Sequence, residues 1–129
     1  NKYTRIPGIN IPPSKVADAG WGLISLTLID INSMGLDVIP PIDKGDFPLG
    51  HLLWFGGKSI EDGNRMGGII TAEEALEIDK KADDGMANYG KIIGQYKYPE
   101  PGCVNQVDNT LYNTDSKSPL CGLIFKTGF

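Results

Sequence analysis

The sequence predicts an α+β fold: a twisted antiparallel sheet of about four or five strands, one short amphipathic helix and a C-terminal loop closed by a disulfide. Three observations support this prediction. Short apolar stretches separated by turn residues are typical of β-strands. The run from Thr71 to Gly85 has the start, the periodicity and the stop of a helix. Two cysteines, Cys103 and Cys121, lie late in the chain.

Length and composition set the class of protein. With 129 residues, the chain is expected to form a single domain, 1–129. The 17 glycines and 9 prolines make up about a fifth of it and favour turns and short elements. The net charge is −4 and no basic run is present, so a nucleic-acid partner is not expected. There is no apolar stretch of about 18 residues, so we do not expect this sequence itself to span a membrane.

The first half of the chain predicts an extended lead-in and two strands. Prolines in IPGINIPPSK make residues 1–20 an extended, Pro-rich segment. GLISLTLIDI, residues 22–31, reads as a strand whose core side carries Ile24, Leu26 and Leu28. Residues 37–48 read as a loop or a broken edge strand. HLLWFGG, from His51 to Gly57, reads as a strand that ends in a turn at its double glycine.

The remaining non-helical segments alternate between loop and strand. Their predicted states, in chain order, are a loop at 59–68, a strand at 89–96, a long polar connection at 97–122 with a short strand around Leu111 and Tyr112, and a final strand in 121–129.

Every local signal in TAEEALEIDKKADDG predicts a helix of about three turns. Thr71 and Glu74 have the spacing of a capping box, in which each side chain binds the other residue's backbone amide. Acidic residues in the first turn and lysines near the end suit the helix dipole. Gly85 is placed to end the helix in the left-handed conformation. The predicted apolar stripe comprises Ala72, Ala75, Leu76, Ile78 and Ala82.

The two cysteines are not spaced as a metal site. Neither lies in a C-x-x-C, and the single histidine, His51, is far from both in sequence. We therefore expect a disulfide between Cys103 and Cys121, with two free thiols as the alternative. A disulfide would indicate an oxidising compartment.

The candidates for chemistry are weak, and no enzyme is predicted. His51 lacks a recognisable nucleophile and carboxylate around it, which favours a structural or surface role. Gly57, Lys58 and Ser59 match only the end of a phosphate-binding loop, because the leading glycine position holds Leu52.

An acidic cluster is the remaining candidate. Asp79, Asp83 and Asp84 could offer oxygens to calcium, but they lack the spacing of a calcium-binding loop. A solvated helix face followed by a turn is the favoured interpretation, and no cofactor or metal is expected.

The second half of the chain resembles a known family. ITAEEALEIDKKADDGMANYGKI, residues 70–92, followed by Cys103 and the terminal CGLIFKTGF, resembles the head region of bacterial type IV pilin-like proteins. The family pattern is I-T-x-x-x-A-x-x-I-D-x-K-x-D-D-G. It is matched here by Ile70, Thr71, Ala75, Ile78, Asp79, Lys81, Asp83, Asp84 and Gly85. The earlier PGINIPPSK and HLLWFGG are also similar to the upstream region of such proteins.

The resemblance implies a structural function. A subunit of this kind polymerises with copies of itself into a type IV pilus or a secretion-associated pseudopilus, with help from an assembly machinery. It passes through the inner membrane and periplasm to the surface of a Gram-negative bacterium. The family begins with an apolar helix that anchors it in the membrane, and this sequence does not contain that helix. We therefore expect the head to expose an apolar strip where such a helix would lie.

A binding module is the alternative function. A secreted or periplasmic domain could hold a glycan or a protein partner on exposed aromatic residues. The candidates for that role are Trp21, Trp54, Tyr89, Tyr96 and Tyr98.

Overall fold

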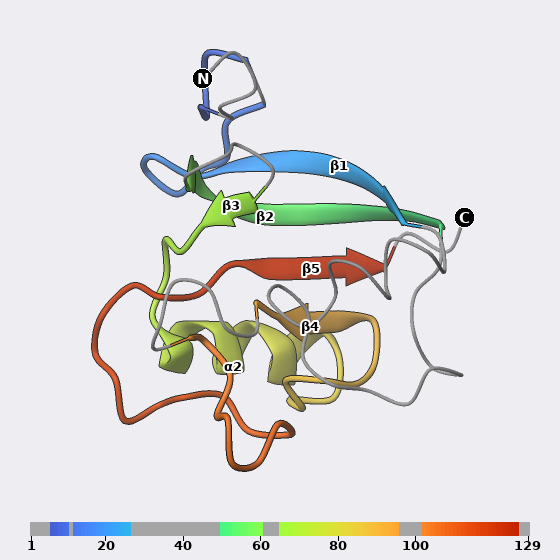
Figure 1. Cartoon of the computed structure of the whole chain (residues 1–129), viewed down its shortest axis with the longest axis vertical. Coiled ribbons are helices and arrows are strands. Elements are labelled where there is room, and N and C mark those ends of the chain that lie inside the picture. The colour runs from blue at the N-terminus through green and yellow to red at the C-terminus, as the bar shows by residue number, and fades with distance from the viewer. Residues whose placement is uncertain (1–5, 11, 27–49, 61–64, 96–101, 127–129) are drawn as a thin grey trace.

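The computed structural model describes residues 6–10, 12–26, 50–60, 65–95 and 102–126. Its elements, shown in Figure 1, are β1 (Gly20–Leu26), β2 (Gly50–Ile60), β3 (Arg65–Gly67), α2 (Ala72–Ala82), β4 (Ile92–Gly94) and β5 (Leu123–Lys126). One helix and a set of antiparallel strands confirm the predicted α+β class in this part of the chain.

The sheet has the strand order β1-β2-β5-β4, and β3 pairs with β2 outside this path. All of these pairs are antiparallel. The register places Phe55 of β2 opposite both Trp21 of β1 and Leu123 of β5. The last strand in the sequence therefore lies between β2 and β4, inside the sheet.

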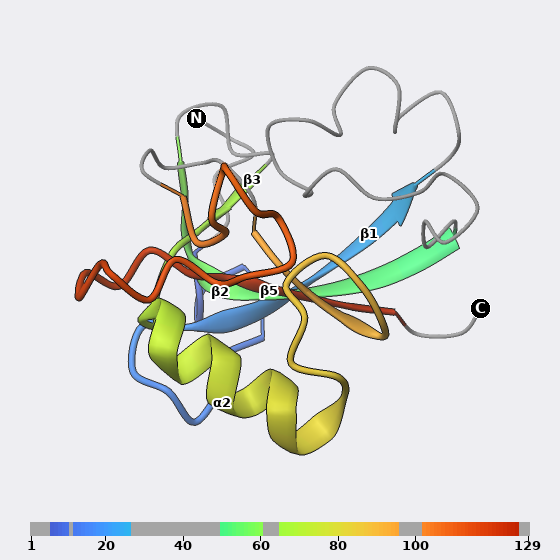
Figure 2. The same cartoon turned by 90° about the horizontal axis from the view of Figure 1, so that it is seen from below.

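The two faces of the sheet are both buried near its centre. Helix α2 covers one face (Figure 2), where Phe55, Ile92 and Leu123 are at most 6% exposed. Residues one position away on each strand point to the opposite face. The buried residues there are Leu52, Trp54, Ile93 and Ile124. Because the neighbouring residues Leu123 and Ile124 of β5 point to opposite faces and are both buried, the start of this strand is continuously apolar rather than alternating.

Helix α2 begins as its sequence predicts. The Thr71 hydroxyl accepts a hydrogen bond from the Glu74 amide at 3.1 Å, and the Glu74 carboxylate accepts one from the Thr71 amide at 3.0 Å. Two amides that the first turn leaves without a helical partner are thus satisfied. Acidic residues lie in the first turn and lysines in the last turn, as predicted.

The buried stripe of α2 differs from the predicted one. The helix buries Ala72, Ala75 and Asp79, whereas Ile78 is 38% exposed and Ala82 is also exposed. Ile78 and Ala82 are therefore not buried as the stripe predicted, and Asp79, which was assigned to solvent, is buried and accepts hydrogen bonds from Gly85 and Tyr112. Gly85 has the predicted left-handed conformation, with φ of 75°, but the helix already ends at Ala82.

Three strand predictions also need correction. Strand β2 continues through Gly56 and Gly57 to Ile60, so no turn follows the double glycine. The predicted loop at 59–68 contains β3, which pairs with β2 across a register shift. Of the predicted strand at 89–96, the described residues 89–95 form a strand only at Ile92–Gly94, and it begins late because the chain has a left-handed φ of 80° at Gly90.

The described part of the long connection, residues 102–122, forms no strand around Leu111 and Tyr112. Tyr112 makes only an isolated bridge with Val104. Within the first predicted strand, residues 20–26 form β1, while 27–31 and the segment 37–48 lie outside the described residues. In the lead-in, the described residues before Gly20 contain no helix, but they form turns rather than an extended segment, with a positive φ at Gly8 and Asp18.

The predicted disulfide joins Cys103 to Cys121 and is fully buried. Cys121 also pairs through its backbone with Ile70, the residue that leads into helix α2. The loop between the cysteines packs closely on the sheet at Gly94. A methyl group at Gly94 would lie 2.8 Å from the Tyr112 ring and 3.1 Å from Val104.

We expect replacement of both cysteines by alanine to lower the free energy of unfolding by about 3 kcal/mol, because the unfolded chain then regains the freedom of an 18-residue loop. Urea denaturation of the oxidised protein and of the double variant measures the difference. Chemical reduction of the wild-type protein should give a similar loss. Equal unfolding midpoints for the oxidised protein and the variant would contradict this role of the disulfide.

Candidate functional site

The acidic end of helix α2 brings three carboxylates together. Asp79, Asp83 and Asp84 each have one carboxylate oxygen within 4.8 Å of the others. Asp79 lies one turn after Ala75 on the buried side of the helix and has no exposed surface. Asp83 is half-buried and Asp84 is exposed. The three predicted calcium candidates therefore do form a cluster, but their environments differ.

Asp79 holds two distant segments together. One of its carboxylate oxygens accepts a hydrogen bond from the Gly85 amide at 3.0 Å, just after the helix end. The other accepts a bond from the Tyr112 hydroxyl, 33 residues further along the chain. Since Tyr112 lies between Cys103 and Cys121, this carboxylate joins helix α2 to the disulfide-closed loop.

Asp83 and Asp84 organise the turn that follows the helix. One oxygen of Asp83 accepts hydrogen bonds from the amides of Lys91 at 2.6 Å and Ile92 at 3.0 Å. Asp84 accepts one from the Met86 amide at 2.9 Å. These bonds fold the chain back toward the start of β4.

Gly90 is what allows this close approach. It adopts a left-handed φ of 80°, and a methyl group there would lie only 2.1 Å from the Asp83 carboxylate and 2.6 Å from that of Asp84.

The buried pair has unusual proton affinities. Burial raises the pKa of Asp79 from 3.8 to about 6, and the neighbouring charges of Asp84 and Asp83 act in the same direction. The hydrogen bonds from Tyr112 and Gly85 oppose this rise only in part. Burial also raises the pKa of Tyr112, as does its hydrogen bond to the Asp79 carboxylate. Tyr112 is therefore a neutral donor under ordinary conditions.

Hydrogen bonds within the chain account for all three carboxylates. Calcium binds six to eight oxygen ligands, and an acidic cluster alone is a weak signal for it. Asp79 and Asp83 each accept two bonds from amide or hydroxyl donors, and Asp84 accepts one. We interpret the cluster as structural, and the absence of calcium binding stays a prediction.

The other candidates for chemistry are scattered. His51 is exposed at the start of β2, and both cysteines are in the disulfide. Lys58 lies within β2 and not in a phosphate-binding loop. Among the described residues, His51 and the cysteines do not belong to the group of possible metal ligands that contains Asp79, Asp83 and Asp84.

The aromatic candidates for a binding surface are also dispersed. Trp54 is 1% exposed and faces the core. Trp21 is half-buried, and its ring packs at a tilt against those of Phe55 and Phe125, with ring centroids 5.1 Å and 5.5 Å apart. Tyr89 is half-buried, while Tyr96 and Tyr98 lie outside the described residues.

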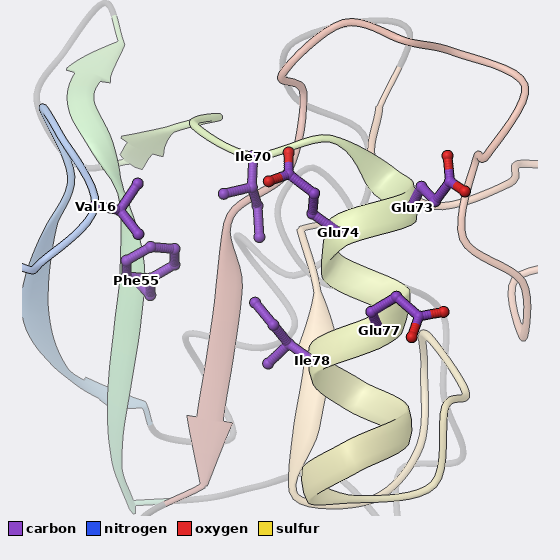
Figure 3. Close-up of a pocket in the computed structure, with 7 residues that line it drawn as sticks. All are labelled: Val16, Phe55, Ile70, Glu73, Glu74, Glu77 and Ile78. Carbon is purple, nitrogen blue, oxygen red and sulfur yellow. The ribbon is translucent and has the colours of Figure 1, made fainter.

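A groove separates helix α2 from strand β2. It has a volume of about 330 Å³, and its lining residues are Val16, Phe55, Ile70, Glu73, Glu74, Glu77 and Ile78. Figure 3 shows the four apolar side chains turned toward the gap, while Glu73 and Glu77 point away from it. Sequence reasoning missed this groove. Its one sequence signal was the apolar Ile78, which the structure leaves partly exposed.

The same sheet face carries exposed apolar side chains beyond the groove. Leu23 of β1 is 62% exposed, and its β2 partner Leu53 is 37% exposed. The register places both on the side of Phe55, and the half-buried Trp21 and Phe125 share that side. We call these four residues the apolar strip.

Comparisons with protein-family models, with curated proteins and with solved structures find no match for this chain. A search of the described residues for a helix long and apolar enough to cross a membrane also finds none.

We expect Gly90→Ala to destabilise the protein by at least about 2 kcal/mol more than Gly8→Ala does. Both glycines have a φ of 80°. A methyl group added at Gly8 would meet no atom within 4 Å, whereas one added at Gly90 would collide with Asp83. Gly8→Ala thus isolates the strain of the left-handed backbone, about 1 kcal/mol. Urea denaturation of the two variants is the measurement, and equal losses would show that the Asp83 contacts contribute nothing.

Addition of a chelator should leave the thermal unfolding midpoint of the purified protein unchanged, because chain donors already engage the three aspartates. A ligand that binds only the folded state would otherwise raise that midpoint. The measurement is a thermal melt with chelator and with added calcium. A midpoint that falls with chelator and returns with calcium would make the cluster a calcium site.

Proposed function

We propose that this chain is the exposed head of a structural subunit of a bacterial type IV pilus or of a related pseudopilus. The observation that carries the proposal is the apolar strip beside helix α2. Large exposed apolar surfaces usually mark a place where another element or molecule packs. A subunit that must pack against a helix and against its own copies requires such a surface.

The covalent chemistry of the fold supports the same function. A buried disulfide is typical of proteins that mature outside the reducing cytoplasm. The stretch from Ile70 to Ile92, which carries the family resemblance, forms the capped helix, the aspartate turn and the start of β4. These residues act as scaffold, which fits a structural role in which no reaction has to be catalysed.

In this proposal, the partners are copies of the same chain and the machinery that assembles them. The filament would lie on the surface of a Gram-negative bacterium, after the subunit has passed through the inner membrane and the periplasm. Attachment to the membrane would depend on an apolar helix that precedes the head.

The proposal predicts that deletion of the gene in its native host removes surface filaments or impairs secretion. Reintroduction of the complete wild-type gene should restore them. The same gene with Leu23→Asp and Leu53→Asp should not, because two charges in the apolar strip oppose apolar packing. Electron microscopy of filaments, a secretion assay and an immunoblot of subunit level are the measurements.

Ile9→Asp is the matched control, because Ile9 is 77% exposed but lies outside the apolar strip. It should restore filaments at the wild-type level. A deletion strain with unchanged filaments and unchanged secretion would contradict the proposed function. Restoration by the double aspartate variant would show that the apolar strip is not the packing surface.

A further inference from the structure

The loop from Gly102 to Cys121 shares a buried apolar cluster with helix α2, and the Tyr112–Asp79 hydrogen bond is a buried polar contact between them. A backbone bond from Ala87 to the carbonyl of Thr110, at 2.9 Å, lies beside it. Among the described residues, the ion pair between the two segments joins Glu73 to Lys117; both side chains are exposed, so it contributes little. The buried contact is therefore the main polar link between helix and loop.

No positive charge balances Asp79 among its described neighbours. On its own helix, Lys80 reaches toward Glu77 at 3.9 Å with both side chains exposed. The turn after the helix supplies the Gly85 amide, the like charge of Asp84 and the exposed Lys91, whose amide binds Asp83. The loop supplies the neutral hydroxyl of Tyr112. An ionised Asp79 thus faces two neutral donors and the like charges of Asp83 and Asp84.

We propose that Asp79 and Tyr112 form a proton-dependent latch, in which a proton taken up by the buried carboxyl group in mildly acidic solution fastens the loop 102–121 to helix α2. The neutral carboxyl group still offers a carbonyl oxygen to Gly85 and retains a hydrogen bond with the Tyr112 hydroxyl. It also removes a buried charge and its repulsion from two carboxylates. The proton comes from solvent and returns to solvent when the pH rises.

The direction of the effect follows from linkage. In the closed form the pKa of Asp79 is about 6, against 3.8 for an exposed aspartate. The closed form therefore binds the proton more tightly. Its added stability is complete below about pH 4 and is lost as the pH rises through about 6. The equilibrium constant for opening should increase about a hundredfold over that interval.

The latch would control an exposed surface. The loop presents Val107, which is 98% exposed, and Leu111, which is 52% exposed. Asn105 and Asp108 shape the tip by accepting hydrogen bonds from the backbone of residues 107, 108 and 110. When Tyr112 is bound to Asp79, these apolar side chains are held in one place. When that contact is broken, they can move. This inference does not depend on the proposed function.

Hydrogen exchange of the folded, disulfide-bonded protein between pH 4.5 and 7.5 tests the latch. The reporters are the amides of Ala87, Asn105 and Asn113, whose partners lie in or next to the loop. Protection, corrected for intrinsic exchange, should fall by at least about tenfold with rising pH in the wild-type protein. Protection should not change with pH in Asp79→Asn, which mimics the neutral form. In Asp115→Asn, which changes an exposed aspartate of the same loop, protection should fall with rising pH as it does in the wild-type protein.

Two outcomes would overturn the latch: wild-type protection that is independent of pH, and an Asp79→Asn profile that matches the wild-type slope. If Asp79→Asn does not fold, carbon-13 NMR of the wild-type aspartate carboxyl groups decides the question. Titration of Asp79 near pH 6 together with the shift of the loop amides supports the latch. Titration at or below the ordinary aspartate range overturns it.

Discussion

The covalent bond between Cys103 and Cys121 is the constraint on which the rest of this fold depends. Cys121 ends the long loop and leads into β5, and its backbone pairs with Ile70, which leads into helix α2. One residue thus fixes the loop, the entry to the helix and the central strand relative to one another. A domain of this size with so many short elements has little regular secondary structure to set such relations, and a cross-link restricts the unfolded chain instead.

Helix α2 could be predicted in detail because its signals are local. The Thr71–Glu74 box acts within three residues, and its two hydrogen bonds form as expected. The disulfide could also be predicted. Once the spacing of the two cysteines argues against a metal site, a pair of free thiols is the remaining alternative. Strand β3 could not, because three residues with a glycine carry no periodicity and their pairing depends on a shifted register with β2. The turn expected at Gly56 failed for the same reason: glycine permits a turn, but the neighbouring strands decide.

Asp79 is the clearest limit of sequence reasoning. Its charge assigned it to solvent, and the residue that buries it, Tyr112, lies 33 positions away in a stretch that reads as polar loop. Its position four residues after Ala75 was the available signal, but an amphipathic pattern normally places a carboxylate outside. The family resemblance includes Asp79, Asp83, Asp84 and Gly85 in its pattern but does not explain what these residues do. The hydrogen bonds supply one, because these residues fold the chain from the helix end back to β4.

The position of β5 has a consequence for how the protein is made. Strand β5 pairs with both β2 and β4, yet it follows both of them in the sequence. Until β5 has been synthesised, strands β2 and β4 lack the strand that pairs with both of them. The disulfide also cannot form before its second cysteine, Cys121, has been added. Helix α2, with its own capping groups, can form early, but the sheet closes only through contacts between residues far apart in sequence. The sheet is therefore completed only when β5 joins it, and strands β2 and β4 must be kept from pairing with other chains until then.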